Sequence, residues 1–232
     1  MRALGGEVYA ISSEPQVLAA RARREWSLGF ETVGDPHHEI AEVCRQRGWL
    51  DLVVNERLGF LLSTAEQIGE GRDWKPTHPK GFFQPGILAL RQDATVLYRW
   101  RGIPTHKNMG GAIERPTPAW VWKHLEAALD AGDKAVDAPL DRKPELDSRG
   151  IPWILFASLL IANGWFIRPR GFSNARLLPY AAARLVAFVL GWVAAFAFLP
   201  ALPVALGLAA WVAWIAPRVR WLGREFQQVE AE

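Results

Sequence analysis

The feature that most constrains this chain is a long apolar run that is almost free of charge. Between residues 151 and 217 there is no Asp, Glu or Lys, and Ala, Leu, Val, Phe and Trp dominate. A soluble domain of this composition would expose large apolar patches, whereas a lipid bilayer solvates such a surface. Residues 151–221 are therefore predicted to form a membrane domain, followed by a polar tail over residues 222–232. The alternative is a very apolar soluble helical bundle.

The apolar run divides into three segments. Residues 151–167 are near the lower length limit for a membrane span, residues 177–199 are longer, and residues 200–216 form the third segment. Pro200 and Pro203 break the helix between the last two segments. These two are therefore predicted to form a transmembrane helical hairpin rather than one long rod.

Arginines predict the orientation of the hairpin. The turn between its two helices has no charge, whereas six arginines lie before and after it: Arg168, Arg170, Arg176, Arg218, Arg220 and Arg224. Cytoplasmic loops of membrane proteins are enriched in Lys and Arg, so both Arg groups are expected in the cytoplasm and the turn outside. Residues 151–167 are then expected to be interfacial or re-entrant. The alternative is three spans, with the N-terminal domain outside.

Two further kinds of side chain belong to the membrane part. Arg184 lies near the start of the second segment, where its long side chain is expected to reach the interface. The tryptophans are expected to be interfacial anchors rather than a cofactor site: Trp153, Trp165, Trp192, Trp211, Trp214 and Trp221.

The first 150 residues have the balanced charge of a soluble domain. The formal net charge of +3 comes from the arginines of the apolar part, which excludes a basic surface for nucleic acid. Cys44 is the one cysteine, so neither an intramolecular disulfide nor a Cys-x-x-Cys motif can form. Because no secretory signal opens the sequence, this domain is expected on the cytoplasmic side.

Residues 1–131 alternate between strand-like and helix-like patterns, which predicts an α/β fold with a mixed sheet flanked by helices. Residues 132–150 are charged, contain prolines and are predicted to be a linker. Strands are expected over 7–12 and 29–35, and a hairpin is expected from 87–90 with 95–101. Two helices are expected to begin at caps: one over 14–26 capped by Ser13, and one that opens at Asp35-Pro36 and ends near Gly48. Two more helices are expected, one within 58–69 and one over 119–131 with Trp122, Leu125 and Leu129 on one face.

Four stretches resemble the peroxiredoxin-like branch of the thioredoxin superfamily, the alkyl hydroperoxide reductase and thiol-specific antioxidant proteins. They are "GGEVYAISSEP", "GFETVGD" followed by Pro36, "QPGILALRQDATVLYRWRG" and "NMGGAIERPTP". The resemblance covers residues 1–131. It implies a thioredoxin-like sheet, thiol-dependent antioxidant activity and a protein thiol as reductant, and it places Pro85 at the family's cis-proline.

The resemblance also implies that the catalytic segment of the family is missing. In the family a central strand and a helix with the peroxidatic cysteine precede the strand matched by residues 7–12. Residues 1–4 match only the last turn of that helix, with Gly5 at its C-cap. Gln84 stands in the region of the family's arginine. No catalytic residue or cofactor is therefore expected, peroxidase activity by this polypeptide alone is not expected, and the sheet should expose unpaired edges.

A complete but redox-inactive thioredoxin fold is the alternative. In that register Ser12-Ser13-Glu14-Pro15 would take the position of the active-site loop, without a cysteine. The protein would then be a non-catalytic binding module tethered to the bilayer. A third hypothesis, a small transport or assembly factor that uses the helical hairpin, rests on composition alone. An upstream cysteine would favour the peroxidase, and homo-oligomers formed through the sheet edges would favour the binding module.

The remaining candidate residues point to no site. Cys44 shares a helix face with Ile40 and Val43 and lies near the helix C-terminus, where the dipole raises the pKa of a thiol, so it is expected to be a packed side chain. No metal site is expected, because His37 and His38 point in different directions and the other candidates, His78 and His106, lie on loops. Four glycines match no phosphate-binding loop: Gly102, Gly110, Gly111 and Gly132.

Overall fold

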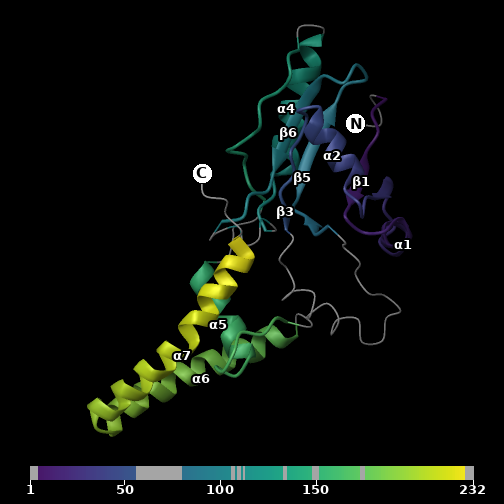
Figure 1. The fold of residues 1–232 in the computed structure, drawn as a ribbon. Helices are drawn as coiled ribbons and strands as arrows, with labels where there is room; N and C mark the ends of the chain where they lie inside the picture. The colour runs from purple at the N-terminus through teal and green to yellow at the C-terminus, as the bar shows by residue number, and fades with distance from the viewer. Residues whose placement is uncertain are drawn as a thin grey trace. The chain divides into compact units, whose positions relative to one another are not determined.

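The structure is a computed structural model, and it divides into two units (Figure 1). It describes residues 5–55, 80–105, 108, 111, 113–132, 135–147, 152–172 and 176–227. The described residues up to 147 form unit 1, and those from 152 onward form unit 2. The expected helical turn over residues 1–4 and the expected helix within 58–69 lie outside the described residues.

Unit 1 begins with a parallel β-α-β element. Strands β1 (Tyr9–Ser12) and β2 (Glu31–Gly34) pair in parallel, and helix α1 (Gln16–Glu25) connects them. A Cβ at Gly34 would lie 2.4 Å from the backbone nitrogen of Gln16, so only glycine lets β2 end this close to α1. The Gln16 side chain accepts a hydrogen bond from the Gly34 N–H at 2.7 Å and donates to the Thr32 carbonyl at 3.1 Å. The predicted strand, helix and strand are confirmed.

The predicted cap of α1 is wrong. The helix begins at Gln16 with Pro15 at its N-cap, and no side chain caps it. The Ser13 hydroxyl instead accepts a hydrogen bond from the Phe83 N–H at 3.3 Å. The Ser13 hydroxyl, which a local cap would use, therefore binds a residue that is distant in the sequence.

Unit 1 has its main hydrophobic core between a hairpin and a helix. Strands β5 (Gly86–Leu90) and β6 (Val96–Arg101) are antiparallel, as predicted, and α4 (Pro118–Asp130) packs on them. The buried core residues are Leu97, Tyr98, Trp100 and Leu125. Leu129 does not share the buried face, since its side chain is 43% exposed, and Ala128 contacts the core instead.

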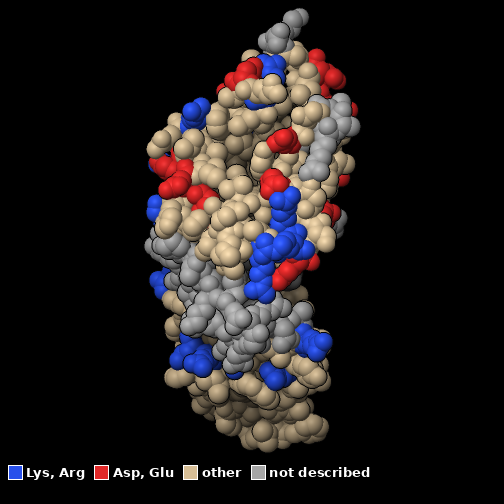
Figure 2. All heavy atoms as spheres, turned by 90° about the vertical axis from the view of Figure 1, so that its right-hand side faces the viewer, with Lys and Arg blue, Asp and Glu red and all other residues tan. Residues whose placement is uncertain are grey.

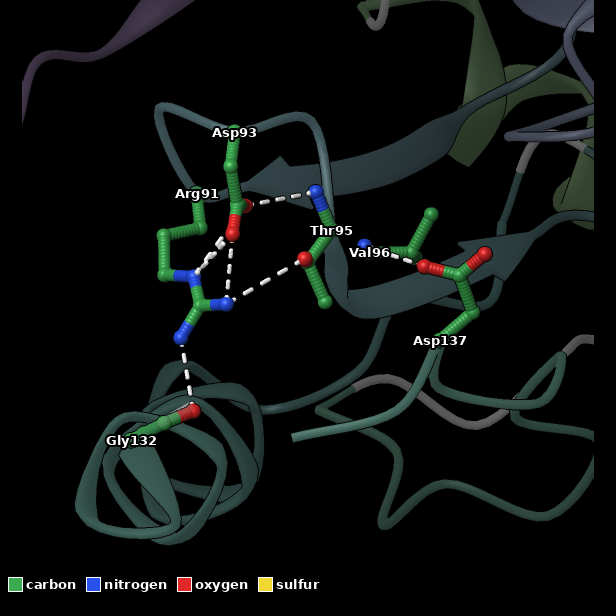
Figure 3. Close-up of polar contacts among 6 residues, drawn as sticks. All are labelled: Arg91, Asp93, Thr95, Val96, Gly132 and Asp137. Atoms are coloured by element: carbon green, nitrogen blue, oxygen red, sulfur yellow. Dashed lines mark hydrogen bonds and ion pairs between the residues drawn. The ribbon is translucent and has the colours of Figure 1, made fainter. Parts of the chain in front are cut away.

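Polar contacts fix the turn of this hairpin to the end of α4 (Figure 3). The Arg91 guanidinium binds the Asp93 carboxylate at 2.5 Å and donates to the Gly132 carbonyl at 2.6 Å. Asp93 also accepts from the Thr95 N–H at 3.0 Å. Hydrogen bonds from Arg91 and Thr95 hold the pKa of Asp93 well below its usual range.

The described residues between 135 and 147 lie along β6, although they are expected to be a linker. The N–H groups of Ala138 and Asp141 donate to the carbonyls of Val96 and Arg99, at 2.8 and 2.9 Å. In return, the Asp137 carboxylate accepts from the Val96 N–H at 2.8 Å (Figure 3). We call residues 135–147 the strap, because they add a partial extra strand to the edge of the hairpin.

The remaining strands of unit 1 are short. Helix α2 (Glu39–Gln46) follows β2, and β3 (Val54–Asn55) pairs antiparallel with β4 (Phe82–Phe83). The described strands form three two-stranded sheets rather than one mixed sheet. The predicted α/β class is therefore confirmed, while the described strands do not join into the single sheet of a thioredoxin fold.

Unit 2 is a helical hairpin with a short helix beside it. Helices α6 (Leu177–Phe198) and α7 (Ala201–Gln227) are each long and apolar enough to cross a membrane. Few of their apolar side chains are buried within the unit. On the face shown in Figure 2, charges of both signs are mixed over unit 1, while the turn end of the α6–α7 hairpin shows none. The predicted helical hairpin is confirmed, but α7 continues through Pro217 to Gln227, beyond the predicted end of the third segment at residue 216 and into the predicted polar tail.

Helix α5 (Trp153–Asn163) is too short to cross a bilayer. Its 11 residues extend only about 16 Å, roughly half of a hydrocarbon core. After Asn163 the chain turns back, and the Arg170 N–H donates to the Leu160 carbonyl at 2.9 Å. A Cβ at Gly164 would lie 1.6 Å from the Arg168 carbonyl oxygen, so the turn requires glycine. This geometry agrees with the interfacial or re-entrant interpretation rather than a third span.

Candidate functional site

Buried polar side chains gather where β1, β2, β3 and β4 come together. Ser13, Asp35, Asn55 and Gln84 are all buried, and with His38 we call them the strand-end cluster. The Asp35 N–H donates to the Ser12 carbonyl at 2.7 Å, which joins the ends of β2 and β1. Asn55 pairs with Phe82 in the β3–β4 ladder, next to the Phe83 that contacts Ser13. Segments far apart in the sequence thus contribute to one polar centre.

Asp35 organises the start of α2. Its carboxylate accepts hydrogen bonds from the N–H groups of Glu39, Ile40 and Ala41, at 2.7, 3.1 and 3.1 Å. Asp35 thus supplies the acceptor for the first turn, but the predicted helix start is wrong, because the N-cap residue is His38 and the helix begins at Glu39. The reason is His38, whose left-handed backbone (φ 61°) ends the preceding turn before the helix starts.

His38 packs against the cluster rather than projecting as a metal ligand. Its ring lies 4.5 Å from that of Phe83, and its Nε2 is 3.3 Å from the Gly81 carbonyl oxygen. The part of the chain that the structure describes holds no group of three His, Cys, Asp or Glu side chains arranged to bind a metal. His78 and His106 lie outside the described residues.

Gln84 lies at the base of a loop that folds over Pro85. Its side chain is only 4% exposed, and its Oε1 has no hydrogen-bond partner among the described residues. The Gly102 N–H donates to the Pro85 carbonyl at 2.7 Å, and no described peptide bond is cis. The cis-proline that the resemblance implies at Pro85 is therefore wrong. Backbone bonds on both sides, including Gln84 N–H to the Val53 carbonyl at 2.8 Å, hold the segment extended.

Asn108 organises that loop. Its side-chain amide donates to the Ile103 carbonyl at 3.0 Å, and its Oδ1 accepts from the N–H groups of Ile113 and Glu114 at 2.9 and 3.0 Å. Because the Asn108 side chain is fully buried, it acts as a scaffold and not as a ligand group. Gly111 lies against the Gln84 side chain, Gly102 lies next to Pro85, and Gly110 is outside the described residues.

Cys44 lies in the last turn of α2 and is half-buried. Burial raises the pKa of its thiol, and the charge of Asp35 raises it further. The predicted buried stripe is wrong, because no residue of α2 is fully buried and Val43 is exposed. The structure therefore gives Cys44 the opposite of what a peroxidatic cysteine needs, which is a stabilised thiolate.

We expect Cys44 to react slowly with thiol reagents. Because its pKa is raised, alkylation by iodoacetamide at pH 7 should be slower than that of a free cysteine, and the rate should still be rising above pH 9. The pH–rate profile of alkylation, followed by intact mass, measures this, with the Cys44→Ser variant as the blank. A rate that reaches its plateau below pH 7 would contradict it.

Unit 2 contains a second group of interacting side chains, beside the turn that follows α5. The Arg184 guanidinium stacks over the Trp165 ring at 4.0 Å, and that of Arg218 over Trp214 at 3.9 Å. The indole of Trp214 donates to the Ile167 carbonyl at 3.0 Å. We call these five residues the Arg–Trp band. The interfacial roles of Arg184 and of these tryptophans remain predictions.

No family model matches this chain, and no curated protein or solved structure matches it either. Its function must therefore be argued from its own geometry.

Proposed function

We propose that the α6–α7 hairpin attaches this protein to a membrane, with unit 1 on the cytoplasmic side. The exposure of its apolar side chains carries this proposal. A core helix of a soluble bundle would bury these side chains, whereas acyl chains cover them without cost. The arginines outside the turn favour the cytoplasmic orientation. In alkaline carbonate the protein should stay in the membrane pellet, and its release into the supernatant would overturn the attachment.

Unit 1 is proposed to be a peroxiredoxin-like domain that reduces peroxides with a thiol from outside residues 1–232. Support comes from the strand pairs, because β1 pairs only with β2 and β5 only with β6 among the described strands. In the family that the sequence resembles, a central strand leading to the cysteine-bearing helix lies between two such pairs. The thiolate would attack one oxygen of the peroxide and break the O–O bond, which gives a sulfenic acid and, after the leaving oxygen takes up a proton, water or an alcohol. A protein thiol would then condense with the sulfenic acid to form a disulfide and water, and a second thiol of the reductant would reduce this disulfide.

A non-catalytic binding module is the second candidate function. The contact between Ser13 and Phe83 favours it, because it brings the Ser12–Pro15 loop next to Gln84-Pro85. In the redox-inactive register these two segments are the ones expected to meet. The module would then hold a protein partner at the membrane surface.

The intact mass and thiol content of the native protein, isolated with a C-terminal tag, separate the two functions. A mass above that of residues 1–232, a second titratable thiol, and peroxide consumption that stops when this thiol is blocked would support the peroxidase. A matching mass, one thiol and no peroxide consumption would overturn it and support the binding module. The Cys44→Ser variant is the matched control, because it should leave any peroxide consumption unchanged.

A further inference from the structure

The turn of the α6–α7 hairpin has no polar side chain to place in water. From residue 185 to residue 217 the sequence contains no charged, hydroxyl, amide or imidazole side chain. At the turn itself, Phe198 is 85% and Leu202 is 72% exposed. Loops that leave a membrane on its far side are normally polar or flanked by interfacial anchors. This turn has no polar side chain, and the tryptophan before it, Trp192, lies six residues from Phe198, so the turn itself is suited to hydrocarbon and not to water.

The backbone of the turn is also suited to an apolar surrounding. A helix start leaves N–H groups without partners, which is costly in hydrocarbon. Pro200 and Pro203 carry no N–H, and the Leu199 N–H donates to the Ala195 carbonyl at 2.9 Å. The Val204 N–H is directed at the Pro200 carbonyl at 3.5 Å. The two prolines thus lower the number of unsatisfied donors at the turn.

The Arg–Trp band marks the level at which the hairpin meets polar surroundings. The turn after α5 contains Trp165 and Phe166 in left-handed conformations, and irregular backbone of this kind is not tolerated next to lipid chains. Its carbonyls at Phe166 and Ile167 accept from the indoles of Trp211 and Trp214, at 2.9 and 3.0 Å. The irregular turn therefore lies beside the Trp211–Trp214 part of α7.

The contacts of Arg218 agree with this level. Its guanidinium stacks on Trp214 and donates to the Trp214 carbonyl at 2.5 Å, so it points back along α7 toward the turn of the hairpin. Helical side chains normally point this way, and the charged group therefore lies beside Trp214. A charged group at this position favours polar surroundings that extend as far as Trp214.

The distance from this level to the turn is shorter than the hydrocarbon core. At the rise of an α-helix, Trp214 lies about 20 Å from Ala201 along α7, and Arg184 lies about 21 Å from Phe198 along α6. The hydrocarbon core of a bilayer is about 30 Å thick. Although each helix as a whole is long enough to span, the part of the hairpin between the Arg–Trp band and the turn is about one-third too short to place the turn in the opposite headgroup layer.

We infer that the hairpin enters the bilayer from one side and ends inside the hydrocarbon, so that its turn contacts acyl chains and never reaches the far aqueous surface. This inference rests on the proposed membrane attachment and changes its topology. Both ends of the hairpin and α5 lie on the same side. The sequence-based expectation of a turn outside is replaced by a buried turn.

Cysteine accessibility in lipid nanodiscs tests the inference, because both faces of a nanodisc are open to a membrane-impermeant maleimide. Leu202→Cys at the turn and Arg220→Cys, at an exposed position beyond the band, are compared in the Cys44→Ser background. We expect Leu202→Cys to react more than about tenfold more slowly than Arg220→Cys, since hydrocarbon excludes both the reagent and the reactive thiolate. Both should react fully in sodium dodecyl sulfate.

Equal rates at the two positions in nanodiscs would overturn the inference, because the turn would then reach water. Failure of the membrane attachment itself is distinguishable, since the protein would not copurify with the nanodiscs. As a second measurement, a bimane fluorophore on Leu202→Cys should be quenched more by lipids spin-labelled deep in the acyl chain than by headgroup-labelled lipids. The reverse order would also overturn the inference.

Discussion

Replacing Asp141 with alanine is expected to destabilise unit 1 by about 2–4 kcal/mol and to release the strap, because one buried and one half-buried donor would each lose their partner. One oxygen of this carboxylate accepts from the Tyr98 hydroxyl and from the Trp120 indole, both at 2.8 Å. The other accepts from the Lys143 N–H at 3.1 Å. One side chain of the strap therefore holds together β6, α4 and the strap itself.

Hydrogen exchange on the full-length protein measures this effect. Deuterium uptake at the N–H groups of Ala138 and Asp141, which bond to β6, should increase strongly in Asp141→Ala. Tyr98→Phe is the matched control, because it removes one donor together with its need for a partner and should cost only about 1 kcal/mol. Unchanged exchange in Asp141→Ala would show that the carboxylate does not hold the strap.

The same contact makes unit 1 sensitive to high pH. Burial and, next, the hydrogen bond to Asp141 hold the pKa of Tyr98 above its usual range. The Tyr98 hydroxyl loses its proton near pH 10 in the unfolded state and only at higher pH in the folded state. The raised pKa of Tyr98 therefore stabilises unit 1 fully below pH 10, and this stabilisation is lost as the pH rises further. Absorbance titration of the tyrosinate in the wild-type protein and in Asp141→Asn should show a lower pKa in the variant.

Asp35→Ala is the second substitution with a large expected effect, about 2–3 kcal/mol on the stability of unit 1. The variant would leave three N–H groups at the start of α2 without their acceptor. Exchange in residues 39–46 and chemical denaturation should both report the loss. Asp130→Ala, an exposed aspartate at the end of α4, is the control and should change stability by less than about 0.5 kcal/mol.

Cys44 supplies an independent readout for Asp35. Because the charge of Asp35 helps to raise the pKa of the Cys44 thiol, Asp35→Asn should lower this pKa and accelerate alkylation at pH 7. Asparagine keeps one acceptor for the helix start, so α2 should remain folded in this variant. An alkylation rate equal to that of the wild-type protein would mean that Asp35 does not influence the thiol.

The order of polar and apolar residues along the chain predicted the helices and strands that are determined by contacts between sequence neighbours. The alternation from Ile87 to Arg101 was enough for the hairpin, whereas the Asp35-Pro36 pair predicted the presence of α2 but placed its start too early. The contacts that could not be predicted from the sequence join residues that lie far apart along the chain. Nothing near Ser13 indicates that Phe83 takes its hydroxyl, and nothing in the charged stretch around Asp141 indicates its partners on β6 and α4.

The strand-end cluster was missed for the same reason. Asn55 and Gln84 are separate amides in the sequence, and no motif connects them with each other or with Asp35. The one available signal was the unusual position of such amides beside apolar strand residues, since a buried amide needs a partner. The membrane part behaved differently, because its composition alone predicted the hairpin. The depth of its turn, however, depends on contacts of Trp214 and Arg218 that composition does not contain.

The pairing of β1 has a consequence for overproduction of the protein. Among the described strands β1 pairs only with β2, and Tyr9 and Ile11 of β1, with Val8 just before it, are exposed apolar side chains. Such an edge is a template for intermolecular β-sheet growth unless charges interrupt it. Glu7 and Glu31 border this strand and place negative charge beside it. Where no further strand covers this edge, overproduction is expected to be limited by association through β1.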